Sequence, residues 1–235
     1  MDWLVIHITY RCNGRCPNCS NLCAQAPSRE DIPLEQLKQF LAESVELNYP
    51  WKRLYFQGGE CSLYPQIDEA CRIFAEYKEK HNKEVELWFC TNGTAVFTHK
   101  KIKMAEQFGF IIENSNKTMN VLKGIDLIPY IPMNEAPIDV GEPWTEGCFQ
   151  SSECGIAMTR DGYWECAPAA SSARVFHYKP LATSLKELTV EKLQCGFKEH
   201  CKNCGFAMPN RRRVLEQTTT ATWAKALADY KNRPK

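Results

Sequence analysis

Three cysteines close to the amino terminus are the residues of this chain best suited to chemistry. Cys12, Cys16 and Cys19 follow directly on an apolar run at residues 4–8, in a CxxxCxxC spacing. A closed tetrahedral zinc site takes four protein ligands, and an electron-transfer 4Fe-4S cluster also takes four cysteines. Three cysteines would therefore hold a 4Fe-4S cluster with one iron left open to a ligand from outside the protein.

Two further short motifs lie behind apolar runs in the same half of the chain. Residues 53–57 and 85–90 are predicted strands, and they run into Gly58-Gly59-Glu60 and Thr91-Asn92-Gly93. Glycine has no Cβ and lets the backbone approach a ligand closely. All three motifs follow the carboxyl ends of strands, which is where barrel folds place their active sites. We therefore expect one site assembled from three strand ends.

The three motifs, in this order, resemble the signature of the radical SAM enzymes. The resemblance implies a 4Fe-4S cluster on Cys12, Cys16 and Cys19, with S-adenosylmethionine (SAM) bound to its open iron. An external electron donor such as flavodoxin or ferredoxin would reduce the cluster. Cleavage of SAM would then give a 5'-deoxyadenosyl radical that takes a hydrogen atom from an unactivated carbon. No general base is needed to start this reaction, and we nominate no catalytic side chain.

The resemblance also implies which residues bind SAM. They lie in the two later motifs and are Gly58, Gly59, Glu60 and Asn92. The carboxylate of Glu60 would bind the SAM amino group.

Two positions depart from the family pattern. The residue before the third cysteine is usually aromatic and packs on the SAM adenine, but here it is Asn18, so the adenine must be held differently. The residue after Glu60 is commonly proline, and here it is Cys61. We favour Cys61 as a small buried apolar residue. The alternative is a hydrogen-atom donor that quenches a substrate radical.

The segments between the predicted strands carry the periodicity of helices. Apolar residues recur every three or four positions over residues 34–45, behind Asp31 and Pro33, over residues 67–74, and over residues 102–108, opened by Thr98. Near-continuous apolar strands that alternate with amphipathic helices predict a parallel sheet covered by helices on one side.

The chain is too short for a closed barrel. Eight strand–helix units need about 250 residues, so the segment before Cys148 holds about four or five units. The predicted fold class is α/β, an incomplete TIM-like barrel of parallel strands with a small C-terminal cysteine-rich, twitch-like extension. Residues 110–113 and 125–131 are candidate later strands. By the resemblance, Asn114 or Lys117 would meet the SAM carboxylate or ribose, and an ordinary polar turn explains them equally well.

The last third of the chain holds a second group of cysteines. Asp161 and Gly162 predict a turn between two hairpin strands just before Cys166. The pattern resembles the SPASM/twitch extension of radical SAM enzymes, which binds an auxiliary 4Fe-4S cluster. The ligands that this resemblance implies are Cys148, Cys166, Cys201 and Cys204. Cys154, and after it Cys195, compete for one of these places, and a structural zinc site is the alternative for the whole region.

Composition excludes several classes of protein. The 235 residues are 44% hydrophobic, enough for a real core, and the net charge of +1 gives no electrostatic footprint for nucleic acid. The apolar run at residues 4–8 is too short for a signal peptide or a membrane span. Thirteen cysteines without an export signal fit metal ligation in a reducing compartment better than disulfides. We expect a cytoplasmic protein with neither a nucleic-acid nor a membrane partner.

The expected organisation is a partial barrel at residues 1–147, an auxiliary-cluster region at 148–210 and a terminal helix at 211–235 that packs on the core. The expected substrate is a small polar metabolite such as a sugar, nucleoside or cyclitol, because the chain is short and has no obvious leader-peptide domain. An auxiliary cluster with four cysteines would serve oxidation, and one with three would permit sulfur insertion. The alternatives are a ribosomal peptide substrate, or a non-catalytic iron–sulfur or zinc protein that carries electrons or binds a partner.

Overall fold

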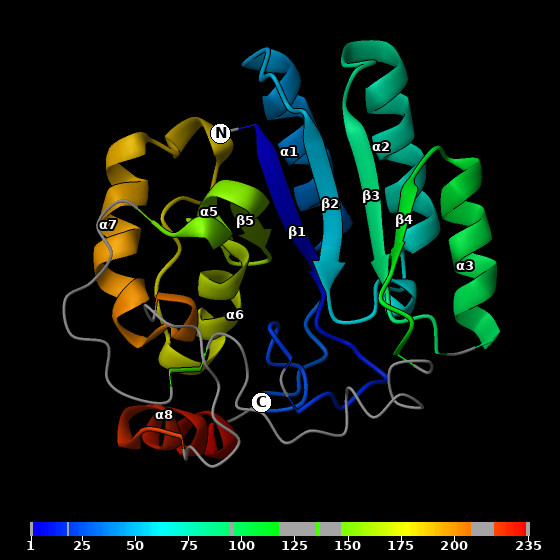
Figure 1. The fold of residues 1–235 in the computed structure, drawn as a ribbon. Helices are drawn as coiled ribbons and strands as arrows, with labels where there is room; N and C mark the ends of the chain where they lie inside the picture. The colour runs from blue at the N-terminus through cyan, green and yellow to red at the C-terminus, as the bar shows by residue number, and fades with distance from the viewer. Residues whose placement is uncertain are drawn as a thin grey trace.

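A six-stranded sheet forms the centre of the molecule, in the strand order β4-β3-β2-β1-β5-β6 (Figure 1). The computed structural model describes residues 2–17, 19–94, 96–117, 135–136, 147–207 and 219–233. The strands are β1 (Trp3–Thr9), β2 (Arg53–Gly58), β3 (Glu86–Thr91), β4 (Ile111–Asn114), β5 (Ile156–Thr159) and β6 (Gly162–Trp164). The four strands predicted first in the chain are confirmed within one residue at each end, whereas the candidate strand at 125–131 lies outside the described residues.

All neighbouring strands of the sheet are parallel except β5 and β6. β1 pairs with β2 in a register that sets Ile6 opposite Phe56, and β2, β3 and β4 continue in the same direction. β5 lies parallel to β1 on its other side and turns through residues 160–161 into the antiparallel β6. The predicted hairpin before Cys166 is confirmed. Within the described chain the sheet is open, with β4 and β6 at its two edges.

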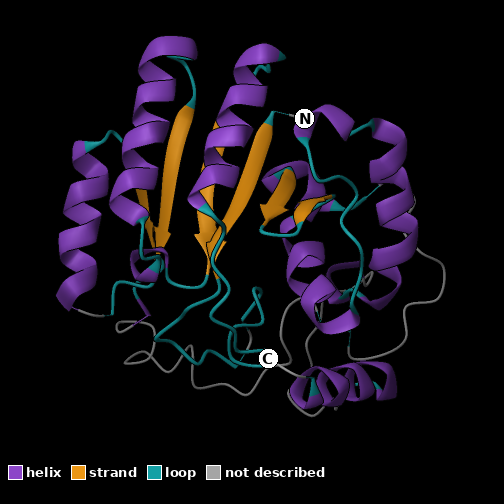
Figure 2. Ribbon diagram, turned by 180° about the vertical axis from the view of Figure 1, so that it is seen from behind, coloured by secondary structure: helices purple, strands orange, loops and turns teal. Residues whose placement is uncertain are grey.

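Three helices cover one face of the sheet (Figure 2). They are α1 (Leu34–Glu46), α2 (Ile67–His81) and α3 (Val96–Gln107). Alternate strand residues such as Leu4, Ile6 and Phe56 point into this layer and are fully buried. The rings of Phe56 and Phe74 meet edge to face at 4.8 Å. Because strand side chains alternate between faces, this core also fixes which side chains lie on the opposite face.

Two details of the helix predictions are wrong. α3 begins at Val96, two residues before the predicted opening at Thr98. Thr98 is instead a buried residue within the helix, and its hydroxyl oxygen accepts a hydrogen bond from Ser62 Oγ at 3.4 Å. Val45 was expected on the apolar face of α1, yet it is 40% exposed. The last turn of α1 instead buries Glu43 and Ser44, whose side chains accept hydrogen bonds from the backbone N–H of Leu185 and the indole N–H of Trp51.

The expectation of helices on one side only is also wrong at β1 and β5. Val5 and Ala157 point to the other face, where they pack with Trp164 against α6 (Ala167–Phe176). The short α5 (Phe149–Cys154) contacts both α6 and β1. The cysteine-rich region therefore continues the main sheet and covers its second face beside β1.

Most of the remaining helices belong to the C-terminal part of the chain. α7 (Val190–His200) is followed by the short 3₁₀ helices η4 (Cys201–Asn203) and η5 (Gly205–Ala207), and η1 (Cys61–Leu63) and η3 (Leu185–Glu187) lie earlier in the chain. The predicted terminal helix is α8 (Ala221–Asn232), whose Trp223 is buried. Trp223 packs with Leu22 and Val175 in a small cluster separate from the main core. The terminal helix thus lies against α6 and the segment after β1.

Among the described residues, no helix is long and apolar enough to cross a membrane.

The division of the chain at residues 147 and 210 stays a prediction. The hairpin assigned to the extension nevertheless belongs to the same sheet as β1 to β4.

Candidate functional site

The segment at residues 10–31, which we call the cysteine loop, follows β1 and carries Cys12, Cys16 and Cys19. Gly14 lies between the first two. A Cβ at Gly14 would stand 3.5 Å from Cys12 Sγ, 3.8 Å from Cys16 Sγ and 4.0 Å from Asn92 Nδ2. The two sulfurs and the end of the third motif therefore border one small space. Cys12 is exposed, and Cys16 and Cys19 are half-buried.

Cys23 joins this group, which the sequence interpretation missed. It is buried, as expected, but its thiol also hydrogen-bonds with the side chains of Cys12 and Cys19. The hydrogen bond from Cys23, with further backbone donors, lowers the pKa of Cys19 to about 6 and also lowers that of Cys12. These interactions raise the pKa of Cys23 itself. Thiolate is the form that binds metal, so Cys23 favours the ligating form of its neighbours.

The carboxylate of Glu60 joins the ends of β2 and β3. It is 1% exposed, and its Oε1 accepts hydrogen bonds from Thr91 Oγ1 at 2.8 Å and from the hydroxyl of Ser62 at 2.7 Å. Its Oε2 accepts from the backbone N–H of Asn92 at 2.7 Å. A carboxylate has about four acceptor positions. Oε1 also accepts from the backbone of Ser62, so the remaining capacity for a ligand lies on Oε2.

The backbone of the two glycines before Glu60 packs directly against the residues at the end of β1. The N–H groups of Gly59 and Glu60 donate to the carbonyl oxygens of Thr9 and Arg11 at 2.6 and 2.8 Å. A Cβ at Gly58 would overlap the Thr9 oxygen, and one at Gly59 would overlap the Arg11 oxygen. Gly58 also has a φ of +114°, which favours glycine. The glycines thus bring the second motif against the residues that lead into Cys12.

Asn92 connects the third motif to the cysteine loop. Its Nδ2 donates to Asn13 Oδ1 at 2.7 Å, and its Oδ1 accepts from both the backbone and the hydroxyl of Thr94. Asn13 lies between Cys12 and Cys16 in the sequence. The structure therefore brings together all three motifs as the sequence predicted.

The residues after β4 form a polar turn against this site. Asn114 Oδ1 accepts from the backbone of Asn116 at 2.8 Å, and the N–H of Lys117 donates to the carbonyl of Asn92 at 3.0 Å. A contact of Asn114 or Lys117 with SAM stays a prediction. Asn18 lies outside the described residues.

Cys61 is buried completely in the main core, and burial raises its pKa well above the usual range for a thiol. It packs behind Glu60, in the same cluster as Ala70 and Cys71. The interpretation of Cys61 as a small buried apolar residue is confirmed.

Arg174 of α6 holds the cysteine loop from the other side. Its guanidinium lies 3.6 Å from the ring centroid of Tyr10 and donates to the carbonyls of Asn21 and Ala26, each at 2.8 Å. Arg174 is only 9% exposed. A cation over an aromatic face and two charge-assisted hydrogen bonds stabilise this contact. Sequence reasoning could not find Arg174, since its partners lie about 150 positions away and no motif marks it.

The terminal helix reinforces the same contact. Tyr230 Oη donates to the carbonyls of Ala26 and Pro27, and the guanidinium of Arg233 donates to the carbonyls of Arg174 and Val175 at 2.8 and 2.7 Å. The cysteine loop is thus held by β2 and β3 on one side and by α6 and α8 on the other.

The four cysteines predicted for the auxiliary site lie at the ends of different elements. Cys148 caps the N-terminus of α5 and Cys166 that of α6, while Cys201 and Cys204 border η4. Burial raises the pKa values of Cys166, Cys201 and Cys204, and the charges of Glu165 and of neighbouring thiols of this set raise them further. The rings of Phe149 and Phe206, with centroids 6.0 Å apart, bring the start of α5 beside the segment that follows Cys204.

Glu165 and His200 lie directly before two of these cysteines and bind each other. His200 Nδ1 and Glu165 Oε1 are 2.8 Å apart, and both side chains are buried. The His200 ring also stacks on Tyr178 at 4.3 Å. His200 therefore joins the end of β6 to the end of α7 through its bond to Glu165.

The two competing cysteines lie differently. Cys154 is at the far end of α5 from Cys148, with Gln150 Nε2 donating to its sulfur at 2.6 Å. Cys195 is exposed on α7. The assignment of Cys148, Cys166, Cys201 and Cys204 as ligands stays a prediction.

The donor chemistry of both cysteine groups fits iron–sulfur clusters, because cysteine thiolates are the ligands that such clusters use. Among the described residues, no three His, Cys, Asp or Glu side chains already stand around a point that could hold a metal ion. Binding of a cluster therefore requires the thiols to turn toward a common centre.

Comparison with known proteins supports the radical SAM resemblance of the first half of the chain. Residues 6–114 match the family model of the Radical SAM superfamily, and so this part of the chain is a radical SAM domain. The crystal structure of BtrN in complex with AdoMet and 2-DOIA is similar in fold, with a TM-score of 0.54 and 14% identity over 93% of this chain and 98% of that one. A SeMet BtrN structure in an open conformation gives a TM-score of 0.52 and 12% identity, over 94% and 98% of the two chains. No curated protein matches the sequence.

The Arg174 contact yields a testable prediction. Arg174→Met removes two charge-assisted hydrogen bonds and the stacking on Tyr10, and we expect it to lower the free energy of unfolding by about 2–3 kcal/mol. Arg160→Met is the matched control: Arg160 is exposed, and the expected change is below about 0.5 kcal/mol. Urea unfolding followed by circular dichroism measures both, and equal effects of the two substitutions would contradict the role of Arg174.

Proposed function

We propose that this chain, whose residues 6–114 carry a radical SAM domain, is a radical SAM enzyme that acts on a small polar metabolite. The observation that carries the proposal is the carboxylate of Glu60, which joins the second and third motifs, while the glycines before it pack on the residues leading into Cys12. A site of this kind needs three separate strand ends held in one place. The hydrogen bonds through Glu60 and Asn92 supply that arrangement.

In this proposal Cys12, Cys16 and Cys19 hold a 4Fe-4S cluster and Glu60 binds the amino group of SAM through Oε2. When bound and reduced by an external electron donor, the cluster would supply the electron that cleaves SAM to methionine and a 5'-deoxyadenosyl radical. Gly58 and Gly59 keep the backbone close enough to leave room for SAM, and Asn92 holds the cysteine loop against β3. The protein's task is placement and exclusion of water, and the cofactor supplies the reactivity.

The substrate class follows from the face of the sheet opposite α1 to α3. Next to the motifs this face carries the amide of Gln57. It also carries the rings of Tyr55 and Trp88, which stack on each other with their centroids 5.8 Å apart. A few polar groups among aromatic rings are typical of sites for small ligands. The fold likeness to BtrN, whose structure holds AdoMet and 2-DOIA, is compatible with a small molecule. We therefore favour a sugar, nucleoside or cyclitol over a ribosomal peptide.

Cys148, Cys166, Cys201 and Cys204 would bind the auxiliary 4Fe-4S cluster. With four thiolates this cluster would accept the second electron of an oxidation. With three it would leave an iron open for sulfur insertion.

Cleavage of SAM is the first test. After anaerobic reconstitution and reduction with dithionite, we expect the chain to form 5'-deoxyadenosine, and Cys12→Ala, Cys16→Ala and Cys19→Ala each to reduce the yield to background because the cluster is lost. Cys195→Ala is the control, since Cys195 is exposed, and its yield should remain within about twofold. Cys23→Ala should keep the cluster held by Cys12, Cys16 and Cys19, because Cys23 is not one of the proposed ligands. Reducible iron–sulfur spectra without any 5'-deoxyadenosine would indicate an electron carrier instead.

Metal content tests the auxiliary site. Two clusters give about eight iron atoms per chain, and Cys201→Ala combined with Cys204→Ala should lower this to about four. Cys154→Ala and Cys195→Ala should leave the count unchanged. About four iron atoms together with one zinc in the unmodified chain would instead assign a structural zinc site to this region.

The substrate class is tested by deuterium transfer. We expect a deuterated sugar, nucleoside or cyclitol to stimulate formation of 5'-deoxyadenosine and to transfer deuterium into it, because the radical abstracts the hydrogen from the substrate. Mass spectrometry of 5'-deoxyadenosine measures the transfer. Stimulation and transfer by peptides alone would reject the small-metabolite assignment and leave SAM cleavage itself intact.

A further inference from the structure

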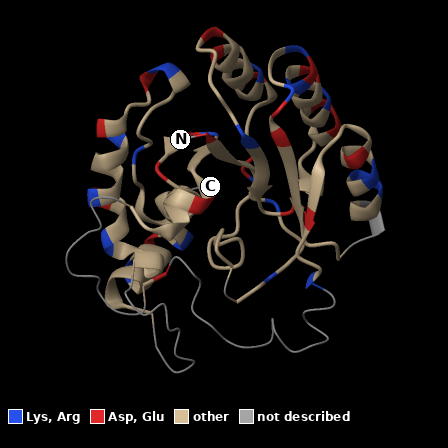
Figure 3. Ribbon diagram, turned by 45° about the horizontal axis from the view of Figure 1, so that its top comes forward, with Lys and Arg blue, Asp and Glu red and all other residues tan. Residues whose placement is uncertain are grey.

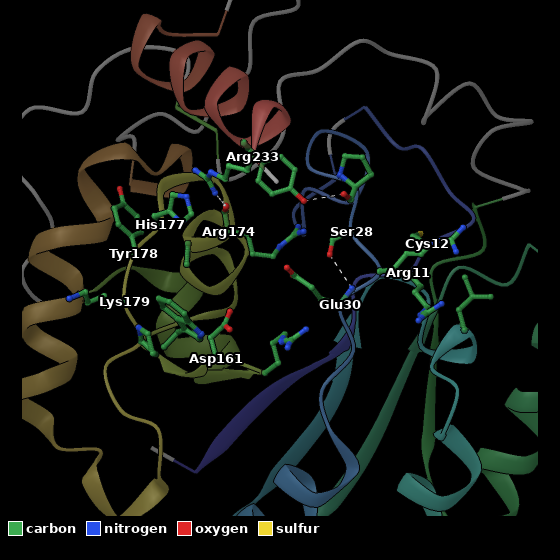
Figure 4. Close-up of a pocket in the computed structure, with 18 of the residues that line it drawn as sticks. Arg11, Cys12, Ser28, Glu30, Asp161, Arg174, His177, Tyr178, Lys179 and Arg233 are labelled. Atoms are coloured by element: carbon green, nitrogen blue, oxygen red, sulfur yellow. Dashed lines mark hydrogen bonds between the residues drawn. The ribbon is translucent and has the colours of Figure 1, made fainter. Parts of the chain in front are cut away.

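A cavity of about 1490 Å³ opens between the cysteine loop and the C-terminal region (Figure 4). Its walls come from the start of the cysteine loop, from residues 27–30, from the β5–β6 turn, from the C-terminal half of α6 and from the end of α8. Pockets for small ligands usually measure about 300–1,000 Å³. This cavity has room for such a ligand and for ordered water around it.

Basic side chains dominate the lining. Seven basic residues face two acidic ones, Glu30 and Asp161, and the basic residues are Arg11, Arg15, Arg29, Arg160, Arg174, Lys179 and Arg233. The whole chain has a net charge of only +1. The lining is therefore far more basic than the chain as a whole, and a concave surface of one sign concentrates ions of the other.

Most of these charges have no acidic partner among the residues that the structure describes. Arg11 is paired with Asp31, but Arg174 and Arg233 donate only to backbone carbonyls, which do not neutralise them. In addition, the Nε of Arg174 is buried without a hydrogen-bond partner within the described chain. A buried guanidinium without a counter-ion is costly, so an anion in this cavity would stabilise the arrangement.

The four other basic residues are the exposed Arg15, Arg29, Arg160 and Lys179, and none of them forms an ion pair in the part of the chain that the structure describes. On the outer helices several basic residues are paired with acidic ones: Arg72 bonds Glu69 and Glu76 on α2, and Lys225 bonds Asp229 on α8. Both acidic and basic residues lie on α1, α2 and α3 (Figure 3). The cavity differs from these helices in that seven basic residues line one concave surface with two acidic ones.

We propose that this cavity binds a small molecule that carries phosphate groups. Guanidinium groups match phosphate oxygens with two parallel hydrogen bonds, which makes arginine the preferred residue for phosphate. Six of the seven basic residues are arginines, and the hydroxyl of Ser28 and the imidazole of His177 add further donors to the lining. The concave shape suits a small ligand better than the surface of a protein. Cys12, one of the proposed cluster ligands, also lines the cavity, so the bound molecule would lie beside the proposed cluster. The inference goes beyond the proposed function, because it assigns a ligand class to the cavity that is tested by binding alone, without turnover.

The test is a binding measurement on the reconstituted full chain. Fructose 1,6-bisphosphate serves as the phosphate-bearing probe and fructose as its uncharged counterpart, in isothermal titration calorimetry at low ionic strength. We expect the bisphosphate to bind and fructose not to bind. Arg160→Gln and Lys179→Gln should each raise the dissociation constant about three- to tenfold, as expected for loss of a charged hydrogen bond. Arg72→Gln, on the outer face of α2, should leave the dissociation constant unchanged.

Three results would overturn the proposal. The first is no binding of the bisphosphate at millimolar concentration. The second is binding that Arg72→Gln weakens as much as the cavity substitutions do. The third is binding of an acidic flavodoxin that Arg160→Gln and Lys179→Gln weaken, without binding of the bisphosphate, which would assign these residues to a protein surface. None of these results depends on turnover, so they leave the proposed radical chemistry unaffected.

Discussion

The buried carboxylate of Glu60 is the interaction on which the candidate site depends. Its oxygens accept hydrogen bonds from Ser62, Thr91 and Asn92, and these donors belong to two different strand ends. A buried carboxylate without such donors would be very unfavourable. The requirement to satisfy it therefore fixes β2 and β3 relative to each other at their carboxyl ends. Asn92 extends this order to the loop that carries Cys12 and Cys16 through its bond to Asn13.

A second set of contacts acts on the same loop from the opposite side. Arg174, Tyr230 and Arg233 all donate to backbone carbonyls, and Arg174 also lies over the Tyr10 ring, so their effect is to fix the path of the chain. The region after β4 thus takes part in shaping the first cysteine site as well as carrying a second group of cysteines. The integrity of α6 and α8 should therefore matter for both sites.

Much of the site was predictable because its signals are local. Apolar runs that end in short motifs locate the strand ends, and the packing of Gly58 and Gly59 on Thr9 and Arg11 explains why glycine is needed there. The environment of Cys23 was missed because burial alone is the usual reason for an isolated cysteine. Its two thiol contacts depend on how the loop turns after Cys19.

Other features depend on contacts between distant parts of the chain. The apolar pattern of residues 156–159 predicts a strand but not its neighbour, and its place beside β1 follows from how the chain returns across the sheet. Arg174 reads as an ordinary helical residue until its partners Asn21 and Ala26 are known. Val45 continues the apolar period of α1, yet period alone does not tell where the core ends.

The parallel pairing of β5 with β1 has a mechanical consequence. Leu4, Val5 and Ile6 lie opposite Ile156, Ala157 and Met158 in a continuous ladder. Because Cys12 follows β1 and Cys166 follows β6 of the same sheet, the two groups of cysteines cannot swing apart as tethered modules do. With clusters bound to both groups as proposed, electron tunnelling between them would cross a constant gap, with a rate insensitive to solvent viscosity.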